Sequence, residues 1–224
     1  MKLTSIVSAH YEKERVIKIE GLLINVDKEK RINIINSAMK EFSKNTFQKA
    51  STNVIVEDAG ISKGLLFHYF GTKANLYKYL EHYSIKIITE EIVEELDWNQ
   101  RDIFLRIKEI SMIKFKIMQR YPYLADFSLR IFKDKAIEEI MHSNPDFPLE
   151  LYSQIYTYNI DYSLFKENID VKKAIDIIRW TIEKYGDEFR RSLKDGSVTF
   201  DYKTVEKEIY VYIDMLKACF YKED

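Results

Sequence analysis

Residues 60–73 read GISKGLLFHYFGTK, and this stretch decides the fold of the N-terminal part of the chain. Gly60 permits the positive φ of a tight turn, and Ser62 is a good residue to begin a helix. Leu66 and Phe70 are spaced i,i+4, so a helix from Ser62 to Phe70 points both side chains to one side. With a short helix before Gly60, the stretch predicts a helix-turn-helix.

The residues before this stretch also have helical spacing. Apolar or small side chains recur every three or four residues between Asp27 and Asn45, and Asp27 is suited to cap that helix. Asn45 can end it, because Asn tolerates the left-handed conformation. A second, short helix is predicted from Ser51–Thr52 to Gly60. The first helix buries a stripe of five residues: Ile34, Ile35, Ala38, Met39 and Phe42.

Residues 60–73 include side chains that are not needed to pack a helix against a core. A glycine inside a helix costs about 1 kcal/mol relative to alanine, but Gly64 would permit close approach to DNA. The N-terminal end of a recognition helix meets base edges in the major groove. The side chains left around the exposed surface are Lys63, Leu65, Phe67, His68 and Tyr69. A helical hairpin without function is the alternative, and the cluster of Lys, His and Tyr argues against it.

The rest of the chain predicts an all-α protein. It has 6 Gly and 3 Pro in 224 residues, which favours long helices over a turn-rich β protein. Helices are expected near 72–96, 99–119, 122–134, 134–142, 147–166, 170–193 and 201–222. Residues 1–26 form an extension of unknown structure with strand-forming residues at 16–26. The helix-turn-helix domain is placed at 27–75, and a larger helical domain at 76–224.

Composition narrows the class of protein. The single Cys219 excludes a disulfide framework and a thiolate metal cluster, and no apolar run is long enough to span a membrane, so a reduced, cytoplasmic setting is expected. Residues 1–75 hold 12 Lys and Arg against 8 Asp and Glu, a net charge of +4, and the remainder holds 23 against 28, a net charge of −5. A basic N-terminal part followed by an acidic remainder is expected if only the N-terminal part binds phosphates.

Catalytic motifs are missing from the sequence. The four histidines are scattered, and neither H-E-x-x-H nor G-x-S-x-G occurs. We therefore expect no enzyme activity, no metal and no cofactor. The alternative function is a helical protein-interaction module that does not bind DNA, and Lys63, Tyr69 and Lys73 together argue against it.

The segment from residue 31 to residue 76 resembles the DNA-binding domain of the tetracycline-repressor (TetR) family. Three departures from the family pattern are Thr46 in place of Gly, Val56 in place of Ala, and Phe67 in place of Tyr. The residues that carry the resemblance are Arg31, Ile34, Ile35, Ala38, Phe42, Phe47, Ala50, Ser51, Ile55, Ala59, Gly60, Ile61, Ser62, Lys63, Gly64, Leu66, Phe67, Tyr69, Phe70, Lys73 and Leu76.

The resemblance implies a DNA-binding transcriptional regulator, by family default a repressor, with a defined set of DNA contacts. Thr52 would bind a phosphate at the start of the second helix, and Lys73 would bind another. Phe67 and Tyr69 would pack on the sugar-phosphate backbone. Base edges or the groove edge would be met by Lys63, Gly64, Leu65 and His68, and the DNA-binding set is completed by Ser62.

The resemblance also implies two roles for the larger domain. The helices near 170–193 and 201–222 would form a homodimer, which reads two half-sites about 34–36 Å apart in a palindromic operator. The alternative is that their apolar stripes serve the core of one chain. A cavity for an apolar or aromatic small-molecule effector would lie among the central helices. Its expected lining is Phe115, Met118, Tyr123, Phe127, Tyr156 and Trp180.

Overall fold

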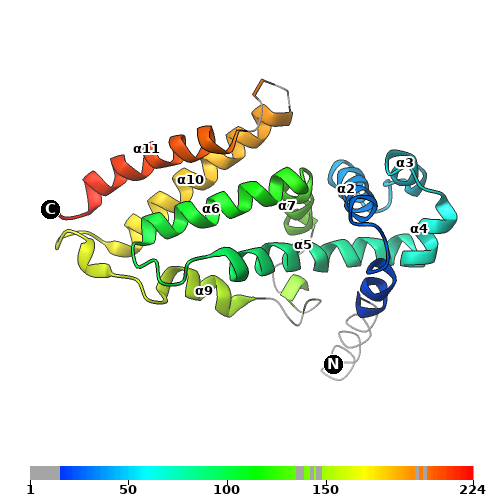
Figure 1. The fold of residues 1–224 in the computed structure, drawn as a ribbon, viewed down its shortest axis with the longest axis horizontal. Helices are drawn as coiled ribbons and strands as arrows, with labels where there is room; N and C mark the ends of the chain where they lie inside the picture. The colour runs from blue at the N-terminus through cyan, green and yellow to red at the C-terminus, as the bar shows by residue number, and fades with distance from the viewer. Residues whose placement is uncertain are drawn as a thin grey trace. The chain divides into compact units, whose positions relative to one another are not determined.

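The structure, a computed structural model, describes residues 16–134, 139–141, 144, 148–194, 197–198 and 201–223 (Figure 1). Within these ranges the protein is built from helices, and its β pairing is limited to an isolated bridge between Phe165 and Tyr221. The predicted all-α fold is confirmed. No helix in the described ranges has both the length and the apolar content that a membrane span requires.

The predicted order of helices is largely confirmed. In chain order, the elements are α2 (Lys28–Lys44), α3 (Thr52–Asp58), α4 (Lys63–Phe70), α5 (Lys73–Glu95), α6 (Ile103–Arg120), α7 (Leu124–Asp134), α9 (Leu149–Thr157), the 3-10 turn η1 (Tyr162–Leu164), α10 (Val171–Lys194) and α11 (Tyr202–Phe220). Residues 16–23 form a further helix before α2. The helix expected at 134–142 falls mostly outside the described residues.

The chain divides into two compact units. One comprises the residues up to Ile88 together with Arg120–Phe147, and the other comprises Thr89–Gln119 together with Pro148–Asp224. Helix α5 therefore begins in the first unit and ends in the second. The sequence analysis divided the chain differently, by function, into a DNA-binding domain at 27–75 and a larger helical domain at 76–224. That functional division stays a prediction.

The core of the first unit forms around α2. All five residues of the predicted stripe are buried, and α2 packs against α3 and α7. The Phe42 ring meets the ring of Tyr77 edge-on, with centroids 5.0 Å apart, and lies 6.3 Å from the ring of Phe127. Burying each such side chain stabilises the fold by about 1.5–3 kcal/mol. The core thus gives α2 a fixed surface on which α3 can rest.

The two ends of α2 are formed in different ways. The Asp27 carboxylate accepts hydrogen bonds from the backbone N–H groups of Glu29 and Lys30, which confirms the predicted N-cap. Asn45 does end the helix, but its φ of −121° is extended, so the predicted left-handed ending was wrong.

A buried carboxylate explains the ending of α2. The Asn45 side-chain amide donates to Glu41 Oε1 at 3.1 Å, and the backbone N–H of Ser51 donates to the same oxygen at 2.8 Å. Glu41 therefore holds both ends of the loop between α2 and α3.

The N-terminal extension is helical at residues 16–23, although its β-branched residues suggested a strand. Ile19 and Leu23 are spaced i,i+4 and both are buried. The Glu20 carboxylate forms an ion pair of 2.8 Å with Lys86 Nζ of α5. Tertiary packing on the first unit therefore overrides local strand propensity.

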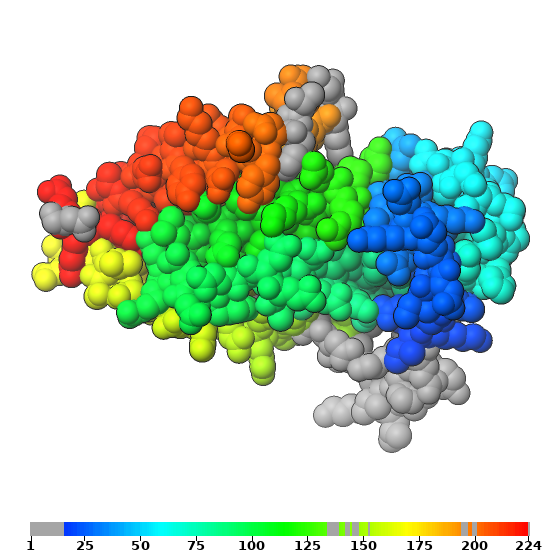
Figure 2. Space-filling view, viewed as in Figure 1, coloured from blue at the N-terminus to red at the C-terminus, as the bar shows by residue number. Residues whose placement is uncertain are grey.

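The second unit is built around α6, α10 and α11. Helices α10 and α11 run side by side (Figure 1), and α11, drawn orange to red, lies on the surface in Figure 2. The core of the second unit contains Ile103, Phe104, Ile107, Met112, Phe115, Phe165, Ala174, Ile178, Ile182, Val205, Ile209 and Ile213. Apart from Phe165, which follows η1, these residues come from all three helices, so burying them holds the helices together.

Two helix boundaries in this unit differ from the prediction. Helix α6 starts at Ile103 rather than near residue 99, because the Asp102 carboxylate accepts the backbone N–H of Phe104 at 2.9 Å and so caps the helix there. Helix α9 ends at Thr157 instead of reaching residue 166. Asn159 has a φ of 55°, a left-handed conformation that interrupts the helix.

A buried arginine connects two loops of the second unit. The Arg106 guanidinium donates to the carbonyl oxygens of Trp98 at 3.1 Å and Tyr158 at 2.6 Å. It also donates to the carbonyl oxygens of Gln100 and Ile155. The guanidinium therefore ties the loop between α5 and α6 to the end of α9, and it satisfies carbonyl groups that helix ends leave free.

Candidate nucleic-acid interface

Helices α3 and α4 form the predicted helix-turn-helix. Gly60 has a φ of +64°, which confirms the positive φ expected at the turn. The chain then turns back so that the backbone N–H of Ile61 donates to the carbonyl of Val56 at 3.0 Å. The side chains that α3 and α4 bury in the core of the first unit are Ile55, Leu66 and Phe70.

The N-terminal end of α4 is exposed and well defined. Ser62 Oγ accepts the backbone N–H of Leu65 at 3.2 Å, which confirms Ser62 as the N-cap. Lys63 and Gly64, in the first turn, are exposed. The first backbone N–H groups of a helix have no acceptor within the helix, so this end suits a phosphate or a base edge.

The structure places the predicted DNA-binding residues at the start of α3, along α4 and at the start of α5, all in the first unit. Ser62, Lys63, Gly64 and His68 are exposed, and Thr52, Leu65, Phe67, Tyr69 and Lys73 are half-buried. The rings of His68 and Tyr69 meet edge-on with centroids 5.5 Å apart. None of the set is lost to the core, and contact with DNA stays a prediction for each.

Gly64 is not required by packing within the chain. A Cβ atom built at this position would meet nothing closer than Ser62 Oγ, at 3.9 Å. Its backbone is helical, unlike that of Gly60 and of Gly71, which has a φ of +71° at the end of α4. The free protein would therefore accept a side chain at position 64, so packing within the described residues does not account for the glycine.

Lys73 has a role in the fold that the sequence did not reveal. Its Nζ donates to the backbone carbonyl oxygens of Ala50 at 2.9 Å and Gln48 at 3.3 Å. It also lies 4.8 Å from the centre of the Phe47 ring, within the range of a cation–π contact. The loop before α3 is thus held by α5. An ammonium has three donors, so one can still reach a phosphate.

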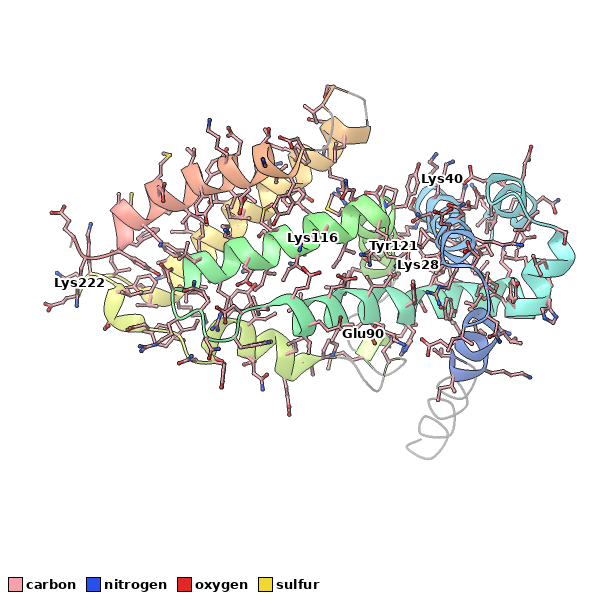
Figure 3. All side chains as sticks on the ribbon, viewed as in Figure 1. Lys28, Lys40, Glu90, Lys116, Tyr121 and Lys222 are labelled. Atoms are coloured by element: carbon pink, nitrogen blue, oxygen red, sulfur yellow. The ribbon has the colours of Figure 1, made fainter. Side chains whose placement is uncertain are left out.

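An ion pair fixes α3 on α2. Lys40, which Figure 3 shows on α2, lies 2.5 Å from the carboxylate of Asp58 at the end of α3. The hydrogen bond from Lys40 holds the pKa of the Asp58 carboxyl below its usual value and raises the pKa of the Lys40 ammonium. The pair therefore helps to orient α3, and through the turn α4.

Replacing Lys73 with Met tests its structural role. We expect the free energy of unfolding to fall by about 1–3 kcal/mol, because two backbone carbonyls lose their donor. Urea unfolding followed by circular dichroism measures the change. Lys28→Met, at an exposed position in the first turn of α2, is the control and should change stability little. Equal stability of the two variants would show that the Lys73 contacts do not hold the loop.

The fold and this surface define the class of helix-turn-helix DNA-binding proteins. The family follows from a comparison of sequences: residues 34–80 match the model of the bacterial regulatory proteins of the tetR family. Residues 34–80 are therefore similar to the tetR-family DNA-binding segment, and the resemblance seen in the sequence is confirmed. A comparison with curated protein sequences finds no match.

Solved structures of regulators share the fold over most of the chain. A TetR family transcriptional regulator from Chloroflexus aurantiacus J-10-FL is 20% identical with a TM-score of 0.58, and the match covers 91% of this chain and 98% of that one. A gamma-butyrolactone receptor (ArpA-like protein) is 17% identical, with a TM-score of 0.52 and coverage of 85% and 98%. A TetR-like regulator from Rhodococcus sp. RHA1 is 15% identical, with a TM-score of 0.51 and coverage of 84% and 92%.

The six residues predicted to line an effector cavity fall in both units. Tyr123 and Phe127 belong to the first unit, where Phe127 is fully buried against Phe42 and Tyr77. The second unit holds Phe115, Met118, Tyr156 and Trp180. Of these, Phe115 is buried, and the side chain of Trp180 is 56% exposed. Their contact with an effector stays a prediction.

Metal binding has no support in the part of the chain that the structure describes, where no three His, Cys, Asp or Glu side chains come together as a metal site requires.

Proposed function

We propose that the protein is a ligand-responsive transcriptional repressor that binds a palindromic operator as a homodimer. The observation that carries the proposal is the exposed first turn of α4, where Lys63 and a glycine not needed for packing lie at the end of a helix anchored by Leu66 and Phe70. A surface of this kind is suited to close contact with DNA.

Each side chain of the surface has a proposed role. Lys63, Gly64 and His68 meet base edges, together with Leu65. Tyr69 and Phe67 pack on the sugar-phosphate backbone. Thr52 and Lys73 bind phosphates on either side of α4, and Ser62 keeps the first turn of α4 in place. Phosphate contacts set the register, and base contacts give the specificity.

Exposed apolar side chains support the homodimer. Part of the apolar stripe predicted on α10 and α11 is buried within the chain, as the alternative in the sequence analysis would have it; these residues are Ala174, Ile178, Ile182, Val205 and Ile209. A second apolar set on the same two helices is exposed to solvent; it consists of Ile177, Trp180, Val211, Tyr212 and Met215. A second copy of the chain would cover this set, which we name the α10–α11 patch.

Charges in the α10–α11 patch should separate the subunits. We expect the double variant Trp180→Glu, Met215→Glu to be monomeric at micromolar concentration, because burying an unpaired carboxylate opposes association. These side chains are 56% and 64% exposed, so the chain should still fold. Sedimentation equilibrium gives the mass. Leu129→Glu, on α7 and 57% exposed, is the control and should stay dimeric. A monomeric unaltered protein would rule out this dimer.

Selection of bound sequences from random duplex DNA tests the DNA-binding function. We expect an enriched palindrome with half-site centres about 34–36 Å apart, and an affinity that falls steeply as salt rises. If no sequence is enriched and no salt-dependent binding occurs, the helical protein-interaction module becomes the better reading.

The proposed response to a ligand would act through α5. This helix begins next to α4 in the first unit and ends in the unit that contains α10 and α11. A ligand that favours one position of α5 would change the separation of the two α4 helices in a dimer. Coupling of about 1–3 kcal/mol would change operator affinity about 5–150-fold.

A further inference from the structure

The loop between α2 and α3 has a backbone that hydrogen bonds fix in place. The carbonyl oxygen of Thr46 accepts the backbone N–H groups of Lys49 at 3.0 Å and of Ala50 at 2.9 Å, so the loop closes into a turn. Lys73 Nζ, at the start of α5, binds the carbonyl oxygens on either side of Lys49, which belong to Gln48 and Ala50. The backbone of Lys49 is therefore held both within the loop and from α5.

The side chain of Lys49 is free, in contrast to its backbone. It is exposed, and no hydrogen bond or ion pair joins its ammonium to another residue in the part of the chain that the structure describes. Other lysines of the first unit form ion pairs, Lys40 with Asp58 at 2.5 Å and Lys86 with Glu20 at 2.8 Å. A free ammonium on a fixed backbone can bind an anion without reordering the loop, which lowers the cost of binding.

Acidic side chains are sparse in the sequence around this loop. Residues 42–80, which contain the loop, α3 and α4, hold five lysines and two acids, a net charge of +3 with histidine neutral. The two acids are Glu57 and Asp58, and Asp58 is already paired with Lys40. A local excess of lysine is the charge pattern of a surface that binds phosphates. The anion best suited to Lys49 is therefore a phosphate of nucleic acid.

Lys49 also lies close to two residues of the proposed DNA-binding surface. Thr52, at the start of α3, follows three residues later, and three residues span at most about 11 Å. Lys73 contacts the residues on either side of Lys49. Along one DNA strand a phosphate recurs about every 3.4 Å of helix axis. A strand whose phosphate meets Thr52 thus brings a neighbouring phosphate within reach of Lys49.

We propose that Lys49 binds a backbone phosphate on the DNA strand that Thr52 contacts, and that Lys73 is its positioning residue. Lys73 holds the backbone on both sides of Lys49, so the exposed ammonium is presented from one place in the loop. A phosphate contact contributes affinity and register but reads no base. The inference rests on the proposed function and extends the proposed DNA-binding surface from α3, α4 and the start of α5 to the loop before α3.

The salt dependence of DNA binding tests the role of Lys49. The full-length protein, Lys49→Met and Lys49→Arg are titrated by fluorescence anisotropy at several salt concentrations, with the selected operator and with a duplex of shuffled sequence. For a dimer of Lys49→Met, the slope of log K against log salt should be shallower by about 1.8, since each phosphate contact contributes about 0.9. Affinity should fall by the same factor for both duplexes. Lys49→Arg should keep the slope of the unaltered protein.

The control is Lys28→Met, which removes the same charge elsewhere in the first unit. Lys28 is also exposed, and it lies at the other end of α2, a helix of 17 residues that is about 25 Å long. Lys28→Met should leave the slope unchanged. Urea unfolding should give the same stability for Lys49→Met as for the unaltered protein, because the side chain is exposed and unpaired. A loss of stability as large as that of Lys73→Met would show that Lys49 serves the loop, and the assignment would be wrong.

The remaining results each contradict the inference in a different way. If Lys49→Met binds the operator with an unchanged slope, Lys49 meets no phosphate, while the proposed regulator stands. If Lys28→Met lowers the slope equally, the effect is one of net charge. If Lys49→Met weakens binding to the operator alone, Lys49 contacts a base instead of a phosphate. If the unaltered protein binds neither duplex, the proposed DNA-binding function itself fails, which none of the other results implies.

Discussion

Gly64→Trp should fold normally and lose operator binding by about a hundredfold or more. Each good base contact is worth about 1–3 kcal/mol, and a dimer would lose such contacts in both subunits. Operator binding is weakened because an indole at this position would keep the first turn of α4 away from the floor of the DNA groove. Within the chain, a Cβ at position 64 has no neighbour nearer than Ser62 Oγ at 3.9 Å, and the position is exposed, so we expect the variant to fold.

The control for Gly64→Trp is Gly21→Trp. Gly21 is also an exposed helical glycine, and a Cβ there meets nothing within 4 Å, but it lies in the helix of residues 16–23, away in sequence from α4. Affinity is measured by fluorescence anisotropy on the selected operator, and circular dichroism checks the fold. A folded Gly64→Trp variant that binds the operator as Gly21→Trp does would refute the role of Gly64 in close approach.

Arg106→Met should lower the free energy of unfolding of the second unit by about 2–4 kcal/mol. The substitution keeps an apolar stem but removes the donors to four backbone carbonyls, and each buried acceptor left unpaired costs about 1–3 kcal/mol. Arg106→Lys should also be destabilising, because an ammonium cannot reproduce the planar fork of donors that reaches both loops.

The control is Arg101→Met. Arg101 is 61% exposed and pairs with Asp161 at 3.2 Å, so its loss should change stability by less than about 1 kcal/mol. Both tryptophans, Trp98 and Trp180, lie in the second unit, so their fluorescence during urea unfolding reports on this unit. If Arg106→Met is as stable as Arg101→Met, the buried guanidinium does not hold the two loops.

Local signals made α4 and its surroundings predictable. The N-cap at Ser62, the turn at Gly60 and the i,i+4 pair of Leu66 and Phe70 all depend on residues within a few positions of one another. For the same reason the stripe on α2 could be predicted, since it repeats at the period of a single helix. These elements are enough to place the candidate DNA-binding surface.

Contacts between residues distant in sequence could not be predicted in this way. Asn45 ends α2 in an extended conformation because the buried Glu41 carboxylate accepts hydrogen bonds from both Asn45 and Ser51. No local sequence pattern predicts that a carboxylate will be buried. Lys73 reaches backbone carbonyls more than twenty residues earlier, so its role in the loop had no signature. Tertiary packing likewise decides that residues 16–23 are helical.

The effector residues were hard to predict for a different reason. The chain has 16 Tyr and 13 Phe, so aromatic side chains do not distinguish a cavity from a core. Phe127, selected as a lining residue, packs beneath α2 with Phe42.

The helix of residues 16–23 has a consequence for how the protein is handled. The tetR-family match begins at residue 34, and a chain trimmed to start at Asp27 would seem to keep the whole DNA-binding domain. Such trimming would uncover the apolar surface that Ile19 and Leu23 cover, worth about 1.5–3 kcal/mol for each side chain, and would remove the Glu20 partner of Lys86. A shortened protein would be prone to aggregate. The first residue of the family match is therefore not the first residue needed for a stable fold.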